Sequence, residues 1–145
     1  MSEIEFHFNV PDKLAYGCRL LRKAHSSGAC ITVTAESGLL AELDALLWGF
    51  GATEFVPHCT ETAPATTLAV TPIVLTGAPA NAPHQDVLVN LGSQVPAGFE
   101  GFRRFIEVVS LSPEDMQIGR RRWKHYAARG YALKKHDLAK TGSAA

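Results

Sequence analysis

The apolar residues of this chain change their spacing repeatedly, from every second residue to the spacing of a helix and back. Residues 3–8, EIEFHF, place an isoleucine and two phenylalanines on one side of an extended chain, which predicts a strand. A helical stripe follows over residues 11–25, and Gly28 ends it. The same patterns then predict a strand at 30–35, a helix at 37–48, strands at 71–77, 86–92 and 102–111, and a last helix from Ser112-Pro113 to about Arg129, before Gly130.

This alternation predicts a three-layer, Rossmann-like α/β domain with a mostly parallel central sheet and a basic C-terminal helix. We expect residues 1–138 to form that single domain and 139–145 to be a disordered tail. Residues 60–70 are predicted to be a loop. The helix at 37–48 is predicted to have Ser37 as its N-cap and a core face of five leucines: Leu39, Leu40, Leu43, Leu46 and Leu47.

Positive charge is concentrated near the end of the chain. The net charge of the whole chain is zero, yet residues 117–145 hold eight Lys and Arg against one acid, while residues 1–116 hold six against thirteen. The segment GRRRWKHYAARGYALKK, residues 119–135, interleaves three aromatic residues with these cations. An acidic body would be repelled by a long stretch of nucleic acid, so we expect the cations to bind something small.

Composition and cysteine content narrow the class of protein. The chain is 46% hydrophobic and 19% charged, which is typical of a soluble globular domain. It contains no apolar run long enough to span a membrane, and its N-terminus lacks the pattern of a secretory signal. Three widely spaced cysteines, Cys18, Cys30 and Cys59, imply no disulfide framework. We therefore expect a cytoplasmic protein with no membrane contact.

The sequence contains no convincing catalytic, metal or cofactor site. Gly49 and Gly51 follow a predicted helix instead of a strand and lack the third glycine and the lysine of phosphate-binding loops. His58 and Cys59 have no second pair at zinc-like spacing. Cys59 could meet a histidine in space to form a nucleophile, but no motif marks it as activated, and buried inert cysteines are far commoner.

A second distinctive stretch is LLWGFGATEFVPH, residues 46–58, which gathers large aromatic residues around two glycines. One interpretation is a helix end whose aromatics turn into the core, which suits Phe50 and Val56. The other is that Trp48 and Phe55 stay partly exposed at the rim of the sheet and anchor a protein interface. The residues alone leave both interpretations open.

The chain combines LDALLWGFGATEFVPH, the predicted strands DVLVNL and FIEVV, and the closing segment RRRWKHYAARGYALKKHDL. Through this combination it resembles the chi subunit family of bacterial DNA polymerase III. The resemblance extends over nearly the whole chain and is weakest at residues 60–84. It implies a non-catalytic accessory subunit of the clamp-loader assembly in DNA replication. Members of this family join the psi subunit of the clamp loader to the acidic C-terminal tail of single-stranded-DNA-binding protein.

Two sets of site residues follow from the resemblance. The tail-binding residues of the family correspond to Arg120, Trp123 and Lys124, which share one helix face with Ala127. The remaining cations of the segment are expected to contribute long-range attraction: Arg121, Arg122, Arg129, Lys134 and Lys135. The surface for psi, or for another partner such as a repair helicase, corresponds to Trp48, Phe55, Pro57 and His58.

Two other classes of function compete with this interpretation. A protein that binds single-stranded nucleic acid directly would also use cations with interleaved aromatics, but along a groove in place of one helix and its tail. A Rossmann-like enzyme is disfavoured because the phosphate-binding glycines are missing. We therefore expect no tight direct binding of nucleic acid.

Overall fold

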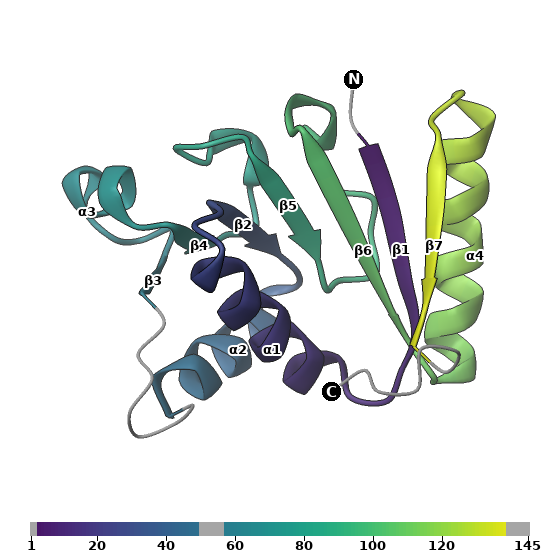
Figure 1. Ribbon diagram of the computed structural model, residues 1–145, viewed down its shortest axis with the longest axis horizontal. Helices are drawn as coiled ribbons and strands as arrows, with labels where there is room; N and C mark the ends of the chain where they lie inside the picture. Colours follow the sequence, from purple (N-terminus) through teal and green to yellow (C-terminus); the bar gives the residue numbers. More distant parts are fainter. Residues whose placement is uncertain (1–2, 50–56, 139–145) are drawn as a thin grey trace.

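The computed structural model describes residues 3–49 and 57–138, and these form a seven-stranded sheet in which all pairings are parallel (Figure 1). The strand order is β3-β4-β2-β5-β6-β1-β7. The strands are β1 (Glu3–Val10), β2 (Ile31–Thr34), β3 (His58–Thr60), β4 (Ile73–Leu75), β5 (Val87–Asn90), β6 (Arg104–Ser110) and β7 (Leu133–Asp137). The predicted three-layer α/β fold is confirmed.

Helices cover the two faces of the sheet. They are α1 (Lys13–Ser26), α2 (Ser37–Gly49), α3 (Ala65–Val70) and α4 (Pro113–Ala128), with short 3₁₀ turns at Pro79–Asn81 and Phe99–Gly101. Helices α1 and α2 lie together on one face, and α4 lies on the other, beside β1 and β7 (Figure 1). Among the described residues, no helix is long and apolar enough to cross a membrane.

Alternation along the central strands divides the apolar residues between two cores. On β6, Phe105 faces α4 and packs with Tyr126, whereas Ile106 faces α1. On β1, Ile4 and Phe6 likewise face α4. This is the period-two pattern that predicted a strand at the start of the chain. The core beneath α4 is rich in aromatic rings, and the core beneath α1 and α2 is mainly aliphatic.

Local signals account for where the helices begin and end. The Asp12 carboxylate accepts a hydrogen bond from the backbone N–H of Ala15 at 3.1 Å and so caps α1. Gly28 and Gly130 follow α1 and α4 with φ of +82° and +84°, a conformation that favours glycine. Ser112, which precedes α4, makes no side-chain capping hydrogen bond. Helix α2 begins at Ser37 itself, one residue earlier than the predicted cap at Ser37 requires.

Three expectations about the elements are corrected. The predicted loop at 60–70 contains the end of β3 and the whole of α3, which buries no residue and therefore has no apolar period in its sequence. Strand β7 was not predicted, because LKKHD is a charged edge strand that lacks apolar alternation. Leu46 is 45% exposed, although Leu40, Leu43 and Leu47 are buried as expected.

The contact between α4 and the sheet gives the first testable prediction. A Cβ added at Gly119 would lie 2.8 Å and 3.0 Å from the two methyl carbons of Val109, a β-branched side chain that cannot rotate away from both. We expect Gly119→Ala to lower the free energy of unfolding by about 1–2 kcal/mol, despite the better helix propensity of alanine. Urea denaturation measures this change.

Gly38 in α2 is the matched control, because nothing lies within 4 Å of a Cβ built there. Gly38→Ala should leave stability unchanged or raise it by up to about 1 kcal/mol. If Gly119→Ala proved as stable as Gly38→Ala, the close packing of α4 on β6 would be refuted.

Candidate functional site

Helix α4 presents opposite faces to the sheet and to solvent. Gly119, Arg122 and Tyr126 are buried against the sheet. Arg120 and Lys124 are exposed, as expected for two of the three predicted tail-binding residues. The third, Trp123, lies at the boundary and is half-buried. The three predicted residues are therefore neighbours on one side of α4.

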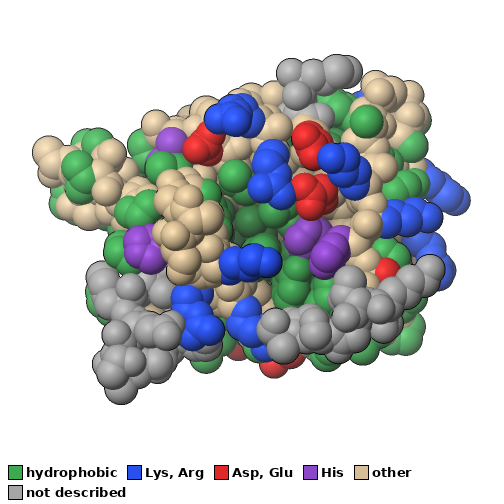
Figure 2. All heavy atoms as spheres, viewed as in Figure 1, with side chains coloured by type: hydrophobic (Ala, Val, Ile, Leu, Met, Phe, Trp, Pro, Cys, Tyr) green, Lys and Arg blue, Asp and Glu red, His purple; other side chains and the backbone are tan. Residues whose placement is uncertain are grey.

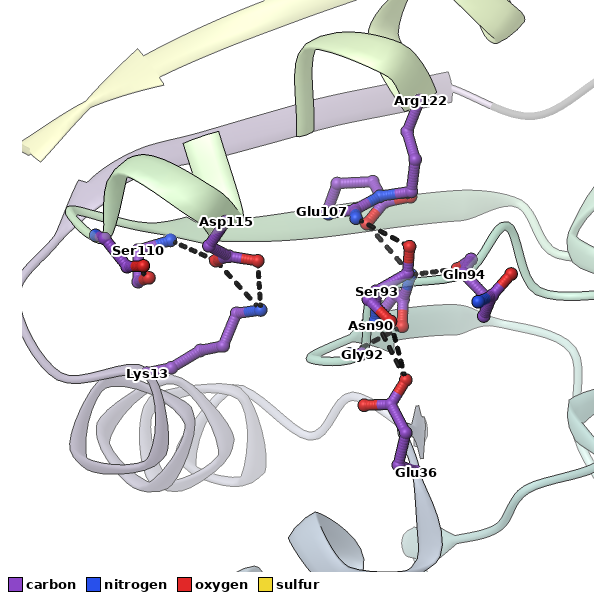
Figure 3. A network of polar contacts seen from close by, with 11 residues as sticks. Lys13, Glu36, Asn90, Gly92, Ser93, Gln94, Glu107, Ser110, Asp115 and Arg122 are labelled. Carbon is purple, nitrogen blue, oxygen red and sulfur yellow. Dashed lines mark hydrogen bonds and ion pairs between the residues drawn. The ribbon is translucent and has the colours of Figure 1, made fainter. Parts of the chain in front are cut away.

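A buried ion pair fastens α4 to the sheet. Arg122 is 3% exposed and its Nε lies 3.1 Å from the Glu107 carboxylate, whose side chain is fully buried on β6. The Tyr126 hydroxyl donates a hydrogen bond to the same carboxylate, and the Asn90 amide donates another at 3.0 Å. Arg122 also donates to the backbone carbonyl of Ser93 at 3.1 Å (Figure 3). The carboxylate thus has partners from two elements, α4 and β5.

Burial raises the pKa of Glu107, while the Arg122 guanidinium and the hydrogen bonds from Tyr126 and Asn90 act in the opposite direction. Arg122 was expected to provide long-range attraction at the surface, and this expectation is wrong. Its guanidinium compensates a buried carboxylate. The sequence gives little warning of this, because Arg120, Arg121 and Arg122 are consecutive and only the orientation of the helix separates them.

Trp123 and Lys135 meet beside the exposed cations of α4. The Trp123 ring packs edge-on against Phe6 with 5.0 Å between centroids, and Lys135 Nζ lies 5.4 Å from the centre of the Trp123 ring. Lys135 occupies this position because it pairs in register with Phe6 on the adjacent strand, so both side chains project from the same face of the sheet. Lys135 thereby adds a third cation to the surface of Arg120 and Lys124.

Other cations of the basic segment have partners within the chain. Lys134 projects from the opposite face of β7, and its Nζ lies 2.7 Å from the Glu3 carboxylate. The hydrogen bond to Glu3 raises the pKa of Lys134. Arg129 donates to the backbone carbonyl of His125 at 3.3 Å. We therefore define the α4 surface as Arg120, Trp123, Lys124 and Lys135.

The predicted partner surface lies at the end of α2. Trp48 is 62% exposed, an unusually open position for a tryptophan, and its ring lies 4.9 Å from the His58 ring. His58 itself is buried, with its Nε2 3.1 Å from the Asp44 carboxylate. Pro57 is half-buried. The buried His58 ring therefore packs against the exposed Trp48 ring. Phe50, Phe55 and Val56 lie outside the described residues.

The carboxyl ends of the strands are where doubly wound folds bind nucleotides. Here carboxylates of the chain itself fill that edge. Glu36 accepts hydrogen bonds from the N–H and hydroxyl of Ser93 at 3.1 Å and 3.0 Å, and Asp115 accepts from the N–H of Ser110 at 2.7 Å (Figure 3). Lys13 lies 3.1 Å from Asp115. Anionic groups at this position oppose a bound phosphate.

The pKa values of these two carboxyl groups support that description. Burial alone would raise the pKa of Asp115, but the hydrogen bond from Ser110 N–H and the nearby Lys13 ammonium lower it overall. The pKa of Glu36 is likewise lowered by hydrogen bonds from Ser93 against the effect of burial. Both groups are thus ionised at neutral pH, and each belongs to the structure of the loops.

Among the described residues, no group of three or more His, Cys, Asp or Glu side chains is placed to hold a metal ion. Cys18 is 2% exposed, and burial raises the pKa of its thiol, which makes the thiolate scarce. Cys30 and Cys59 are partly exposed and are not paired in a disulfide.

Comparison with known proteins gives a consistent result. The family model described as DNA polymerase III chi subunit, HolC, matches residues 1–134. A relative from Pseudomonas aeruginosa, DNA polymerase III subunit chi, is 31% identical over 144 residues, which cover 95% of this chain and 98% of the relative.

The buried ion pair gives the second prediction. Arg122→Met keeps most of the side-chain volume but leaves the Glu107 carboxylate buried without its cation, so we expect a loss of about 3–5 kcal/mol in unfolding free energy near pH 7.5. In the variant, the pKa of Glu107 in the folded protein rises further above its unfolded value. Folding then favours the protonated carboxyl, and the deficit should shrink as pH falls toward about 4.3, the unfolded glutamate pKa.

Arg121→Met is the matched control, because Arg121 is the exposed neighbour on the same helix. It should change stability by less than about 0.5 kcal/mol at every pH. Urea denaturation from pH 5 to 8 measures both variants. A deficit in Arg122→Met that did not change with pH would contradict the assigned role of Glu107.

Proposed function

The chain belongs to the DNA polymerase III chi subunit family, and on that premise we propose that it bridges the clamp loader to single-stranded-DNA-binding protein. In this proposal the α4 surface binds the acidic C-terminal tail of single-stranded-DNA-binding protein. The Trp48 surface, which comprises the predicted residues Trp48, Phe55, Pro57 and His58, binds psi or another protein partner, such as a repair helicase. The protein acts in the cytoplasm and has no catalytic role of its own.

The observation that carries the proposal is the pairing of exposed cations with an aromatic ring on a fixed helix. Arg120 and Lys124 are exposed, and the half-buried Trp123 is their neighbour on α4, with Lys135 Nζ 5.4 Å from the centre of its ring. An arginine can hold a carboxylate with two parallel hydrogen bonds, and a lysine adds a compact charge. The ring provides an apolar wall beside them.

These groups match the chemistry of an acidic tail that ends in phenylalanine. Such a tail presents side-chain carboxylates, a terminal carboxylate and an apolar ring within a few residues. The cations would hold the carboxylates while the phenyl ring packs on Trp123. Because α4 is anchored by the Arg122–Glu107 pair, its exposed side chains need little reordering to bind, which limits the entropic cost of association.

The two proposed surfaces lie at opposite edges of the sheet. His58, beneath Trp48, is on β3, the first strand in the sheet order, and Lys135 is on β7, the last. Six strand spacings of about 4.8 Å place these edges roughly 30 Å apart. Two partners can therefore bind at the same time without touching, as a bridging subunit requires.

The charge distribution favours a peptide over nucleic acid as the partner of α4. Residues 1–116 hold thirteen acids against six Lys and Arg, so the chain outside the basic segment has a net negative charge. Of the eight cations after residue 116, Arg122 and Lys134 are held by Glu107 and Glu3. The six that remain can neutralise only a few phosphates at once, so direct binding of single-stranded DNA should be weak at physiological salt.

The α4 surface gives the third prediction. A labelled peptide that copies an acidic tail ending in Asp-Ile-Pro-Phe should bind the protein, and more weakly as salt rises. Arg120→Ala and Lys124→Ala should each weaken binding roughly tenfold or more, because each removes a charge-assisted hydrogen bond. Fluorescence anisotropy measures the dissociation constants.

Arg103→Ala is the control for loss of an exposed cation, since the Arg103 side chain is 84% exposed and pairs with Asp86, outside the α4 surface. It should leave the affinity unchanged. Equal affinity of Lys124→Ala, Arg120→Ala and the unaltered protein would overturn the assignment. Tight binding of an oligothymidine by the isolated protein would favour direct nucleic-acid binding instead.

The exposed tryptophan gives the fourth prediction. Trp48→Ala should cost less than about 1 kcal/mol in stability, because the ring is mostly exposed. It should abolish capture of purified psi or helicase in a pull-down and leave the affinity for the tail peptide unchanged. Phe105→Ala in the buried core is the contrast and should cost about 3–5 kcal/mol. Loss of both binding activities in Trp48→Ala would mean that the protein has one site.

A further inference from the structure

A groove of about 820 Å³ lies on the sheet face opposite α4. Helix α1 forms one wall, the strands β5, β6 and β1 form the base, and the end of β7 forms the other wall. Figure 2 shows this face of the molecule, with basic side chains around the hollow and histidines beside it. Neither the α4 surface nor the Trp48 surface contributes a residue to it.

The groove exists because one layer of the fold is incomplete. Parallel sheets are normally covered by helices on both faces. Here α1 and α2 pack side by side over β2, β5 and β6, and no described helix covers β1 and β7 on that side (Figure 1). The uncovered strip is bordered by α1 along one side. This is the position that a further helix occupies in a complete three-layer domain.

The uncovered strip of β1 and β7 contains polar residues that pair with one another and with Arg104 of β6. Glu5 accepts from Arg104 at 2.7 Å and lies 3.2 Å from His7 Nε2. The His7 ring also bonds the Tyr16 hydroxyl and stacks near His136, with 4.8 Å between centroids. Burial lowers the pKa of His7, so this histidine is neutral at physiological pH.

The charge at the rim is strongly positive. Among the described residues, Glu5 is the only acid in the lining, and it already pairs with Arg104 and His7. On α1, Arg19 and Lys23 lie one helical turn apart, and both are exposed without an ion pair to any described residue. Two unneutralised cations along a concave wall favour an anionic occupant.

The inner surface favours aliphatic contacts. Leu20 and Ala24 are half-buried on the α1 wall, and Val89 and Ile106 form the base. Tyr16, the only Phe, Tyr or Trp among the described residues of the lining, is buried and hydrogen-bonded to His7. Nucleic-acid strands bind such grooves mainly by stacking on exposed aromatic rings. A peptide with apolar side chains fits this groove better.

We propose that this groove binds an acidic amphipathic helix of a partner protein, which completes the missing layer of the sheet. The apolar side of that helix packs against Leu20, Ala24 and the base, and its carboxylates pair with Arg19 and Lys23. The proposal does not depend on the tail-binding role of α4.

The test uses the full chain and a fluorescein-labelled 18-residue peptide with leucines at helical spacing and glutamates elsewhere. A twin peptide with lysine in place of each glutamate is the charge control. The groove variant is Arg19→Glu with Lys23→Glu, and both positions are exposed, so folding should persist. Because α4 is also basic, Arg120→Ala with Lys124→Ala is measured in parallel. Ser26→Trp, at an exposed position of the groove wall, blocks the site without changing its charge.

The glutamate peptide should bind the protein, and the lysine twin should not. The groove variant and Ser26→Trp should each weaken binding at least tenfold, while the α4 double variant changes it less than twofold. An excess of oligothymidine should not displace the peptide. The proposal is overturned if the glutamate peptide fails to bind, if only the α4 variant weakens binding, or if the oligonucleotide competes. The acidic tail peptide ending in Asp-Ile-Pro-Phe, titrated against the same variants, measures binding at the α4 surface separately.

Discussion

The ion pair between Arg122 and Glu107 determines how α4 lies on the sheet, and the proposed α4 surface depends on it. A buried carboxylate requires compensation, and the side chains that supply it, Arg122 and Tyr126, come from one face of α4. With that face fixed against β6, Arg120 and Lys124 must point to solvent. A hydrophobic contact alone would allow α4 to rotate or slide by small amounts, whereas the hydrogen-bonded carboxylate permits one orientation. The buried contacts of Glu107 with Arg122 and Tyr126 thus fix the positions of Arg120 and Lys124, although these two side chains do not contact Glu107.

The sheet order gives the molecule two ends with different chemistry. The strand β3 is short and has the exposed Trp48 and the small helix α3 beside it. The strand β7 has lysines, which discourage edge-to-edge pairing with another sheet. The same lysines serve two further purposes, since Lys134 pairs with Glu3 and Lys135 lies over Trp123. The β3 edge therefore presents the exposed Trp48 ring, and the β7 edge presents lysine side chains. These two edges suit partners of different composition.

The sequence predicted the fold because its central strands are buried on both sides and its long helices have strong start and stop signals. Asp12, Gly28 and Gly130 work through local geometry, which can be recognised without knowledge of the rest of the chain. Strand β7 and helix α3 could not be predicted in this way, because β7 is stabilised by pairing with β1 and α3 buries no side chain. The same limit applies to the site. The spacing of Arg120, Trp123 and Lys124 identified one side of α4, but only the rotation of the helix distinguishes Arg122 from Arg121, and only the register of β7 places Lys135 at the ring.

The excess of positive charge in residues 117–145 is therefore less uniform than its total suggests. Arg122 pairs with the buried Glu107, and Lys134 pairs with Glu3. Arg129 donates a hydrogen bond to the backbone carbonyl of His125 in its own helix. The cations that remain around Trp123 are few and close together, and they are fixed by a helix and a strand in place of a flexible tail. Long polyanions are bound by many weakly positioned charges, and their affinity grows with the number of phosphates contacted. A small cluster with one aromatic wall instead gains affinity from the fit of a short acidic segment, because each carboxylate meets a defined donor.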